Sequence, residues 1–221
     1  MDLKLAQVKQ DKRIKTFIWQ TDKYLDALGY TDHGGRHINI VAERARSLAK
    51  KIGLNQQDQE LAAIAGYCHD MGNFLGRDQH HYWAALLFSQ CYLRDYEPLA
   101  VSTVAQAIVS HDKYDLKIVN KVTAVLILAD KSDVHRSRVR EKNRRRLKED
   151  IHDRVNYSVI SNDLLVRLAK KEIILKLKVD TKITDPLEYF EIFIDRMSFC
   201  RLAAEYLGYQ FVLMINNFKL S

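Results

Sequence analysis

Apolar residues recur at every third and fourth position through most of the first 150 residues. This spacing is typical of amphipathic helices that bury one face. It predicts helices over residues 3–28, 37–52, 55–70, 80–94, 99–110 and 120–148. No alternating strand pattern interrupts these segments, so this part of the chain is expected to be an all-α bundle.

The pattern changes after about residue 160. Residues 162–168 and 172–180 are rich in strand-forming side chains, and apolar and charged residues alternate at the end of the second run, which indicates a half-buried strand. Asp185-Pro186 is a typical helix start, the predicted helix ends at Gly208, and residues 209–220 predict a last strand. The expected fold is mainly α. A helical domain covers residues 1–150, and a small α+β subdomain over 151–221 combines a short antiparallel sheet with one helix.

Composition narrows the class of protein. The 221 residues are 47% hydrophobic and 29% charged, which is ordinary for a globular protein. No apolar run is long enough for a membrane span, and residues 1–15 lack the apolar core of a signal peptide. The three cysteines show no paired spacing, as expected for buried thiols in a reducing compartment. We therefore expect a cytoplasmic protein without a membrane partner.

The net charge of +7 is local. Residues 135–148 hold eight basic side chains and one acidic one, so this basic segment alone nets +7 and the remainder is formally neutral. On the predicted helix, the basic residues at 136, 140, 144 and 148 would form one cationic surface. Three interpretations are open for this segment. It could be a solvated helix or a dimer face that binds acidic partners, it could attract a polyanionic substrate, or it could bind nucleic acid. The absence of interleaved aromatic residues disfavours a stacking platform for single strands.

Histidines and aspartates recur where apolar helical faces end. The five positions are His37, His69-Asp70, His80-His81, His111 and Asp130. A single histidine of this kind is usually a hydrogen-bonded core residue, whereas the carboxylate of Asp130, after the buried-type run 122–129, would be costly to bury alone. Imidazole and carboxylate are both good ligands for first-row divalent metals. Their recurrence therefore favours a shared metal site.

The order of these residues resembles that of the HD-domain metal-dependent phosphohydrolases over about residues 30–140. The resemblance implies that a first metal ion is held by His37, His69, Asp70 and Asp130. In members of that family with two metals, the aspartate of the His-Asp pair bridges the ions, which implies that Asp70 bridges here. Two further histidines would bind the second ion, His111 and either His80 or His81. We prefer His80, although Ala84-Ala85 stands where the family often has Gly-Ala, so the choice stays open.

The resemblance also implies a reaction, in which metal-activated water attacks phosphorus. His69 and Asp70 would be catalytic residues, and so would Lys131, which could contact the phosphoryl oxygens. From the residues themselves, substrate contacts are expected from Arg77, Lys131, Arg136 and Arg140, with an ordinary surface charge as the alternative for Arg77 and Lys131. One or two Mn, Fe, Co, Ni or Zn ions fit mixed His and carboxylate ligands better than Mg does. The chain lacks a Gly-x-Ser-x-Gly motif, a P-loop and a dinucleotide fingerprint.

The sequence therefore predicts a phosphohydrolase that cleaves a phosphomonoester or phosphodiester, with a nucleotide as the expected substrate. The alternative is a noncatalytic, metal-stabilised module whose basic helix, residues 136–148, binds nucleic acid or an acidic protein. Nucleic acid is the less favoured partner. A homodimer could form through an exposed sheet edge in the C-terminal subdomain.

Overall fold

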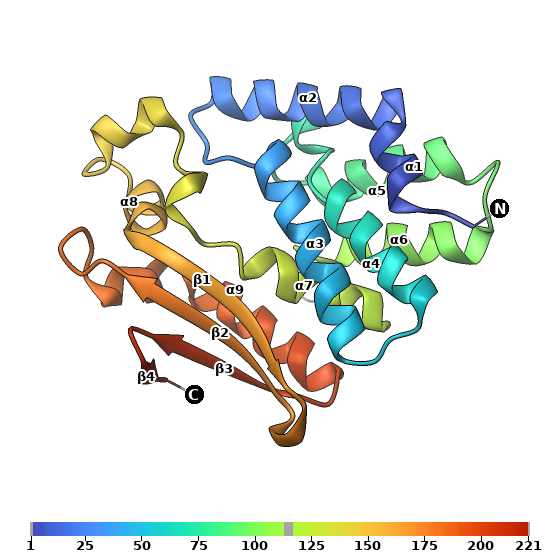
Figure 1. Cartoon of the computed structure of the whole chain (residues 1–221). Coiled ribbons are helices and arrows are strands. Elements are labelled where there is room, and N and C mark those ends of the chain that lie inside the picture. Colours follow the sequence, from blue (N-terminus) through green and yellow to red (C-terminus); the bar gives the residue numbers. More distant parts are fainter. Residues whose placement is uncertain (1, 113–116, 221) are drawn as a thin grey trace. The chain divides into compact units, whose positions relative to one another are not determined.

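The computed structural model describes residues 2–112 and 117–220, and Figure 1 labels its helices and strands. The chain divides into two compact units, and the division falls between Asp130 and Lys131. The mainly α class with an α+β C-terminal part is confirmed. The units are defined by compactness alone, and the domain boundary expected at residue 150 stays a prediction. Within the described ranges, no helix combines the length and apolar character needed to span a membrane.

The N-terminal helix is interrupted, which corrects the prediction of one helix over residues 3–28. Helix α1 covers Leu5–Gln10 and α2 covers Lys12–Ala27. Asp11 lies between them with an extended backbone, and its carboxylate accepts a hydrogen bond from the Arg13 amide at 2.8 Å. A side chain that caps the new helix competes with continuation of the old one, so the chain breaks there.

The other helices of the first unit lie close to their predicted positions. They are α3 (Gly35–Lys51), α4 (Gln56–Cys68), α5 (His80–Tyr92), α6 (Pro98–Ser110) and α7 (Lys121–Lys131), with a short 3₁₀ helix, η1 (Asn73–Leu75), after α4. The second half of α4 is buried on every side. It therefore forms the middle of the unit, and the other helices bury their apolar faces against one another around it.

Helices α3 and α4 approach each other closely at Gly66 (Figure 1). A Cβ atom added at Gly66 would lie 3.0 Å from backbone atoms of Val41 and Ala42. The missing side chain thus allows the two backbones to touch, three residues before α4 ends in His69-Asp70. This contact sets the separation between the start of α3 and the end of α4.

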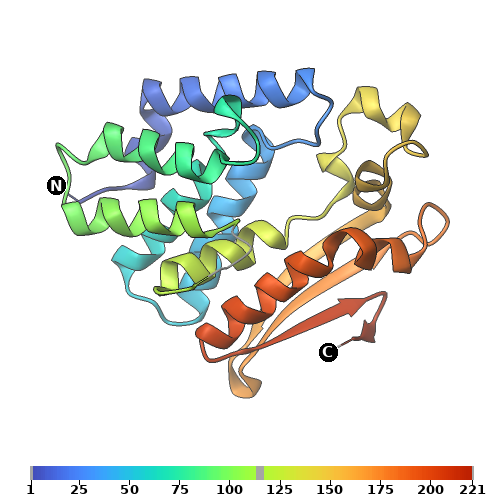
Figure 2. The ribbon, with the colours of Figure 1, turned by 180° about the vertical axis from the view of Figure 1, so that it is seen from behind.

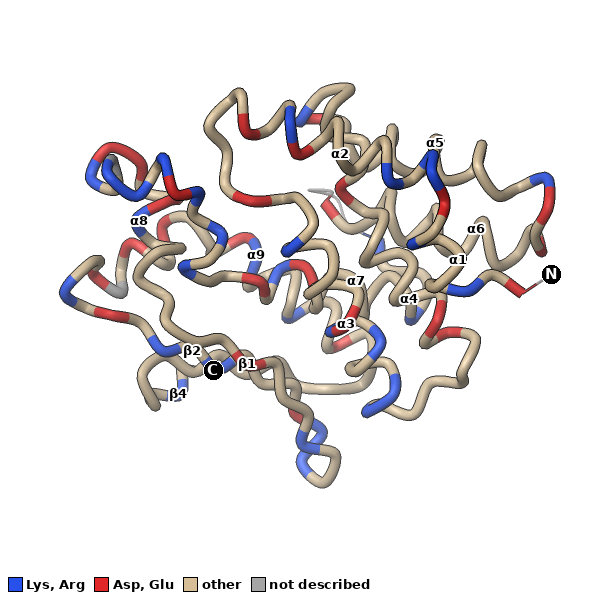
Figure 3. Tube along the Cα trace, turned by 45° about the horizontal axis from the view of Figure 1, so that its top comes forward, with Lys and Arg blue, Asp and Glu red and all other residues tan. Residues whose placement is uncertain are grey.

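The predicted long helix over residues 120–148, and with it the basic helix over 136–148, is wrong. Helix α7 ends at Lys131. The basic segment instead contains two 3₁₀ helices, η2 (Arg136–Arg138) and η3 (Glu141–Arg146). Like charges four residues apart destabilise an α-helix, and the Arg138 guanidinium turns back to donate to the Asp133 carbonyl at 2.8 Å. Figure 3 shows Lys and Arg positions in this part of the chain, before α8, with acidic positions beside them.

The second unit contains α8 (Ile151–Ser158), which the sequence analysis did not assign, and a four-stranded sheet. Strands β1 (Val159–Arg167) and β2 (Glu172–Val179) form a hairpin through η4 (Leu168–Lys170). Helix α9 (Pro186–Tyr206) follows, then β3 (Gln210–Ile215) and β4 (Phe218–Lys219), in the order β1-β2-β3-β4. Figure 2 shows α9 and β3 from behind.

The expectation of an entirely antiparallel sheet is wrong, because β2 and β3 pair in parallel. Such a pair requires a crossover connection, which α9 supplies.

Side chains from the same unit contact the first half of β1, an edge strand. The Asn162 amide donates to the Ser132 and Val134 carbonyls at 3.2 and 2.5 Å. Nε2 of His135 donates to the Ile160 carbonyl at 2.9 Å. Backbone groups of an exposed edge strand otherwise form a template for another strand. This part of the β1 edge is therefore occupied.

We expect Gly66→Ala to destabilise the protein by about 1–3 kcal/mol, because a close backbone contact is overpacked. Thermal and urea unfolding would measure the loss. Gly35→Ala is the matched control, since a Cβ at this exposed position in the first turn of α3 would have no neighbour within 4 Å. Equal stability of the two variants would contradict the proposed role of the α3–α4 contact.

Candidate metal centre

Six buried side chains from the ends of five helices meet in the first unit. His37 lies in the first turn of α3, and His69-Asp70 follow α4 directly. His80 is the first residue of α5, His111 follows α6, and Asp130 is the penultimate residue of α7. None of the six is more than 7% exposed. The helix ends predicted from the sequence thus converge on one place.

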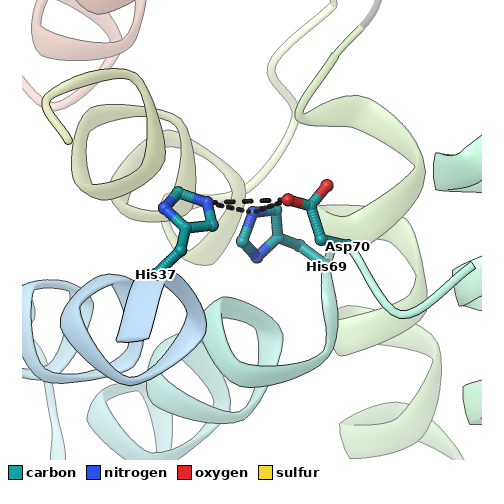
Figure 4. A group of neighbouring side chains, drawn as sticks. All are labelled: His37, His69 and Asp70. Atoms are coloured by element: carbon teal, nitrogen blue, oxygen red, sulfur yellow. Dashed lines mark hydrogen bonds and ion pairs between the residues drawn. The ribbon is translucent and has the colours of Figure 1, made fainter. Parts of the chain in front are cut away.

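Four of these side chains form a first group. Nε2 of His37 lies 3.2 Å from Nε2 of His69, 3.6 Å from Oδ2 of Asp70 and 3.3 Å from Oδ1 of Asp130. Nε2 of His69 lies 3.4 and 3.5 Å from the same two carboxylate oxygens. Figure 4 shows His37, His69 and Asp70 facing one another. Their polar atoms therefore surround a common point.

A second group shares Asp70 through its other oxygen. Nε2 of His80 lies 3.3 Å from Oδ1 of Asp70 and 3.3 Å from Nε2 of His111. Asp112 adds a carboxylate oxygen 3.8 Å from Nε2 of His80. Asp70 thus faces both groups, one with each oxygen, as a bridging ligand would.

Backbone hydrogen bonds orient three of the imidazoles. Nδ1 of His69 bonds to the Gly66 carbonyl at 2.9 Å, Nδ1 of His80 to the Arg77 carbonyl at 2.7 Å, and Nδ1 of His111 to the Ile108 carbonyl at 2.6 Å. A carbonyl can only accept, so each Nδ1 carries a proton, and each ring in its neutral form directs the lone pair of Nε2 into the cluster. Second contacts of this kind are typical of metal-binding histidines.

The spacing and chemistry of the donors fit a divalent transition metal. Metal–ligand bonds of about 2.0–2.1 Å place tetrahedral ligand atoms roughly 3.4 Å apart. The neighbouring polar atoms of both groups are separated by similar distances. Three overlapping sets of ligand atoms each lie within 4.8 Å of one another: His37, His69 and Asp70; His69, His111 and Asp130; and Asp70, His80 and His111. One ion, or two ions that share Asp70, could be held here.

The electrostatics of the centre oppose the cost of burial. Burial alone would raise the pKa of Asp70, but His69, His33, His80 and Arg77 lower it well below its usual value. Burial alone would lower the pKa of His69, but the carboxylates of Asp70 and Asp130 raise it above its usual value. For His80, burial lowers the pKa and Asp70 compensates only in part. Asp70 is therefore held as a carboxylate.

The other residues singled out from the sequence take different places. His81 is buried beside His80 but belongs to none of the three ligand sets, and its ring centroid lies 6.4 Å from that of His111. Arg77 is half-buried, with Nη1 3.9 Å from Oδ1 of Asp70. Lys131 follows Asp130 in α7 and is buried. Arg136 and Arg140 lie in the second unit. Their roles as substrate contacts stay predictions.

The structure also brings in residues that the ligand set from the sequence omitted. Asn73 is fully buried and contacts Asp70, and Asp112 approaches His80. The imidazole of His33 lies 5.6 Å from that of His37, centroid to centroid. Asp112 could have been expected near the centre from the sequence, because it follows the predicted ligand His111. The residue type of Asn73, in a polar loop, offered none.

Comparison with known proteins agrees with this geometry. A family model described as "HD domain" matches residues 34–151, about half of the chain. An uncharacterized protein of Methanocaldococcus jannaschii, MJ1020, is 26% identical over 154 residues. The alignment covers 59% of this chain and 59% of that relative, so the chain spans less than two thirds of the relative's length.

Metal affinity should fall as the pH is lowered from about 8 to 6. Protons and metal compete for Nε2 of His69, and the raised pKa of His69 extends this competition to higher pH than for an ordinary histidine. The loss should approach about tenfold per pH unit for each proton displaced. Titration calorimetry with Mn²⁺ across this range would measure it, with proton release detected from buffer ionisation heats. An affinity independent of pH would contradict ligation by His69.

Proposed function

The chain belongs to the HD domain family, and we propose that it is a phosphohydrolase that cleaves phosphomonoesters or phosphodiesters of nucleotides. Members of this family are in general metal-dependent phosphohydrolases, and the match covers residues 34–151. The observation that carries the proposal is the cluster of six buried ligand-type side chains from five helix ends. A structural role alone would require only one group of ligands. Asp70, which faces one group with each carboxylate oxygen, supports a centre that would hold two cations close together.

We assign the ligands by their distances. His37, His69, Asp130 and Oδ2 of Asp70 would hold one ion, and His80, His111 and Oδ1 of Asp70 a second. His80 is preferred over His81 because Nε2 of His80 lies 3.3 Å from Oδ1 of Asp70 and His80 belongs to one of the ligand sets found among the described residues, whereas His81 belongs to none of them. When bound, such ions lower the pKa of water and neutralise charge on phosphoryl oxygens. Mn, Fe, Co, Ni or Zn suits these ligands.

The chain's own residues would bind and orient the substrate. Arg77 lies beside Asp70 with about a third of its side chain exposed, and a guanidinium in that position can hold phosphoryl oxygens. The ring of Tyr82 lies 4.3 Å from that of His81 and is half-exposed. The His81 ring centroid in turn lies 6.4 Å from that of His111. This aromatic surface supports a nucleobase as part of the substrate, since bases stack on such rings.

The cysteines support a reducing compartment. Cys68, Cys91 and Cys200 are all buried as free thiols. Burial raises the pKa of the Cys68 thiol, which disfavours the reactive thiolate. This is consistent with the proposed cytoplasmic location.

Hydrolysis is tested by purifying the protein, measuring its metal content, and assaying nucleotides and simple phosphoesters with Mn²⁺ or Fe²⁺ supplied. We expect about one or two metal ions per chain, and loss of both metal and hydrolysis in Asp70→Asn, because the variant removes the charge shared by both groups. Asp78→Asn, the same substitution at an exposed loop position, should behave as the wild type. Metal without any hydrolysis would instead favour the noncatalytic alternative.

The nucleotide assignment has its own test. Tyr82→Leu should raise KM for nucleotides by roughly 5- to 100-fold, the range expected for the loss of one stacked base. KM for glycerol phosphate, which has no base, should stay unchanged. An equal change for both substrates would show that Tyr82 affects the centre itself and would remove the argument for a base.

A further inference from the structure

The turn that carries Asp70 is fixed on two sides. The Thr21 hydroxyl donates to the Met71 carbonyl at 2.9 Å from within α2. On the other side Gly72 packs against the first turn of α5, where an added Cβ would lie 2.5 Å from the Ala84 amide nitrogen. The backbone after His69-Asp70 is therefore immobilised against the helix that begins with His80.

Asn73 extends this fixation to the Asp70 carboxylate. Its side chain is fully buried, and Nδ2 donates to the Asp70 carbonyl at 2.8 Å and to Oδ1 of Asp70 at 3.0 Å. Its Oδ1 accepts from Nη1 of Arg77 at 2.8 Å. Both polar atoms of Asn73 are thus used within the centre.

The contact falls on one oxygen of Asp70 only. Oδ2 faces His37 and His69, whereas Oδ1 faces His80 and is also the atom bonded by Asn73. The terminal torsion of an aspartate is soft. A hydrogen bond to Oδ1 therefore determines whether this oxygen is directed toward His80 and His111.

We propose that Asn73 is a positioning residue that presents Oδ1 of Asp70 to the second group and thereby sets the affinity of that group for its ion. The inference rests on the proposed two-ion centre and deepens it. The first group would depend on Asn73 less, because His37, His69 and Asp130 supply three further ligands. Among the described residues, the ligand set of the second group holds His80 and His111 besides Asp70, and Asp112 lies farther out, with a carboxylate oxygen 3.8 Å from Nε2 of His80.

The experiment is a calorimetric titration of the metal-free protein with Mn²⁺, which counts ions and reports both affinities. In Asn73→Ala we expect the second affinity to fall by about 10- to 100-fold, the usual effect of losing a partner of a metal ligand. The affinity of the first group should change by less than about threefold, because Asn73 bonds Oδ1 of Asp70, whereas Oδ2 faces the first group. Asn156→Ala, the same substitution at a buried asparagine in α8 of the second unit, where Nδ2 donates to the His152 carbonyl at 2.8 Å, is the control and should keep both affinities.

Arg77→Ala separates two roles of Asn73. It removes the guanidinium and keeps the Asn73–Asp70 contact, so its effect on the second affinity should be smaller than that of Asn73→Ala. If Asn73→Ala fails to fold by circular dichroism, Asn73→Ser, which leaves a shorter donor, gives the same comparison with a smaller expected loss.

The possible failures are distinguishable. A wild type that binds two ions, with unchanged or equally weakened sites in Asn73→Ala, overturns this inference and leaves the proposed hydrolase intact. An equal effect of Arg77→Ala and Asn73→Ala also overturns it, because Asn73 would then act only through Arg77. A wild type that binds one ion overturns the inference and restricts the proposed function to one metal. A wild type that binds none overturns both.

Discussion

The first unit depends on mutual compensation between buried carboxylates and imidazoles. Asp70 and Asp130 follow the buried apolar runs 61–68 and 124–129, where an isolated charge would be costly. Lone pairs from His37, His69, His80 and His111 would be equally unfavourable without a positive charge among them. Each group is tolerable only because the others are present and a cation, whether proton or metal, can join them. The apolar packing that brings the five helix ends together and the polar cluster at their meeting point therefore require each other.

Much of this arrangement could be predicted from the sequence because local signals and the site coincide. Each ligand-type residue ends or begins an apolar run, so locating the helices also located His37, Asp70 and Asp130. The wrong predictions concern competing local interactions that hydrophobic periodicity does not reveal. Asp11 fits a helical pattern but caps a new helix, and the basic segment has helical spacing but repels itself. The parallel β2–β3 pair depends on how α9 returns the chain, which the strand pattern alone does not contain.

The supporting residues were the least predictable part of the centre. Asn73 is an ordinary loop residue by type, and its value lies in hydrogen bonds to Asp70 and Arg77, partners that are known only from the three-dimensional structure. The same holds for Gly66 and Gly72, whose lack of a side chain allows the backbone of a neighbouring helix to approach closely. Sequence patterns identify residues by their chemistry, whereas orientation of those residues depends on neighbours with no distinctive chemistry of their own.

The covering of β1 limits how copies of this protein could associate. Asn162 and His135 occupy the beginning of the strand, so a sheet that continued across the β1 edge into a second molecule would pair through residues 163–167. That stretch has Asp163 at one end and Arg167 at the other, and two antiparallel copies would place unlike charges opposite each other. The segment is short but electrostatically self-complementary, so any association through it would be antiparallel, two-fold symmetric and weakened by salt.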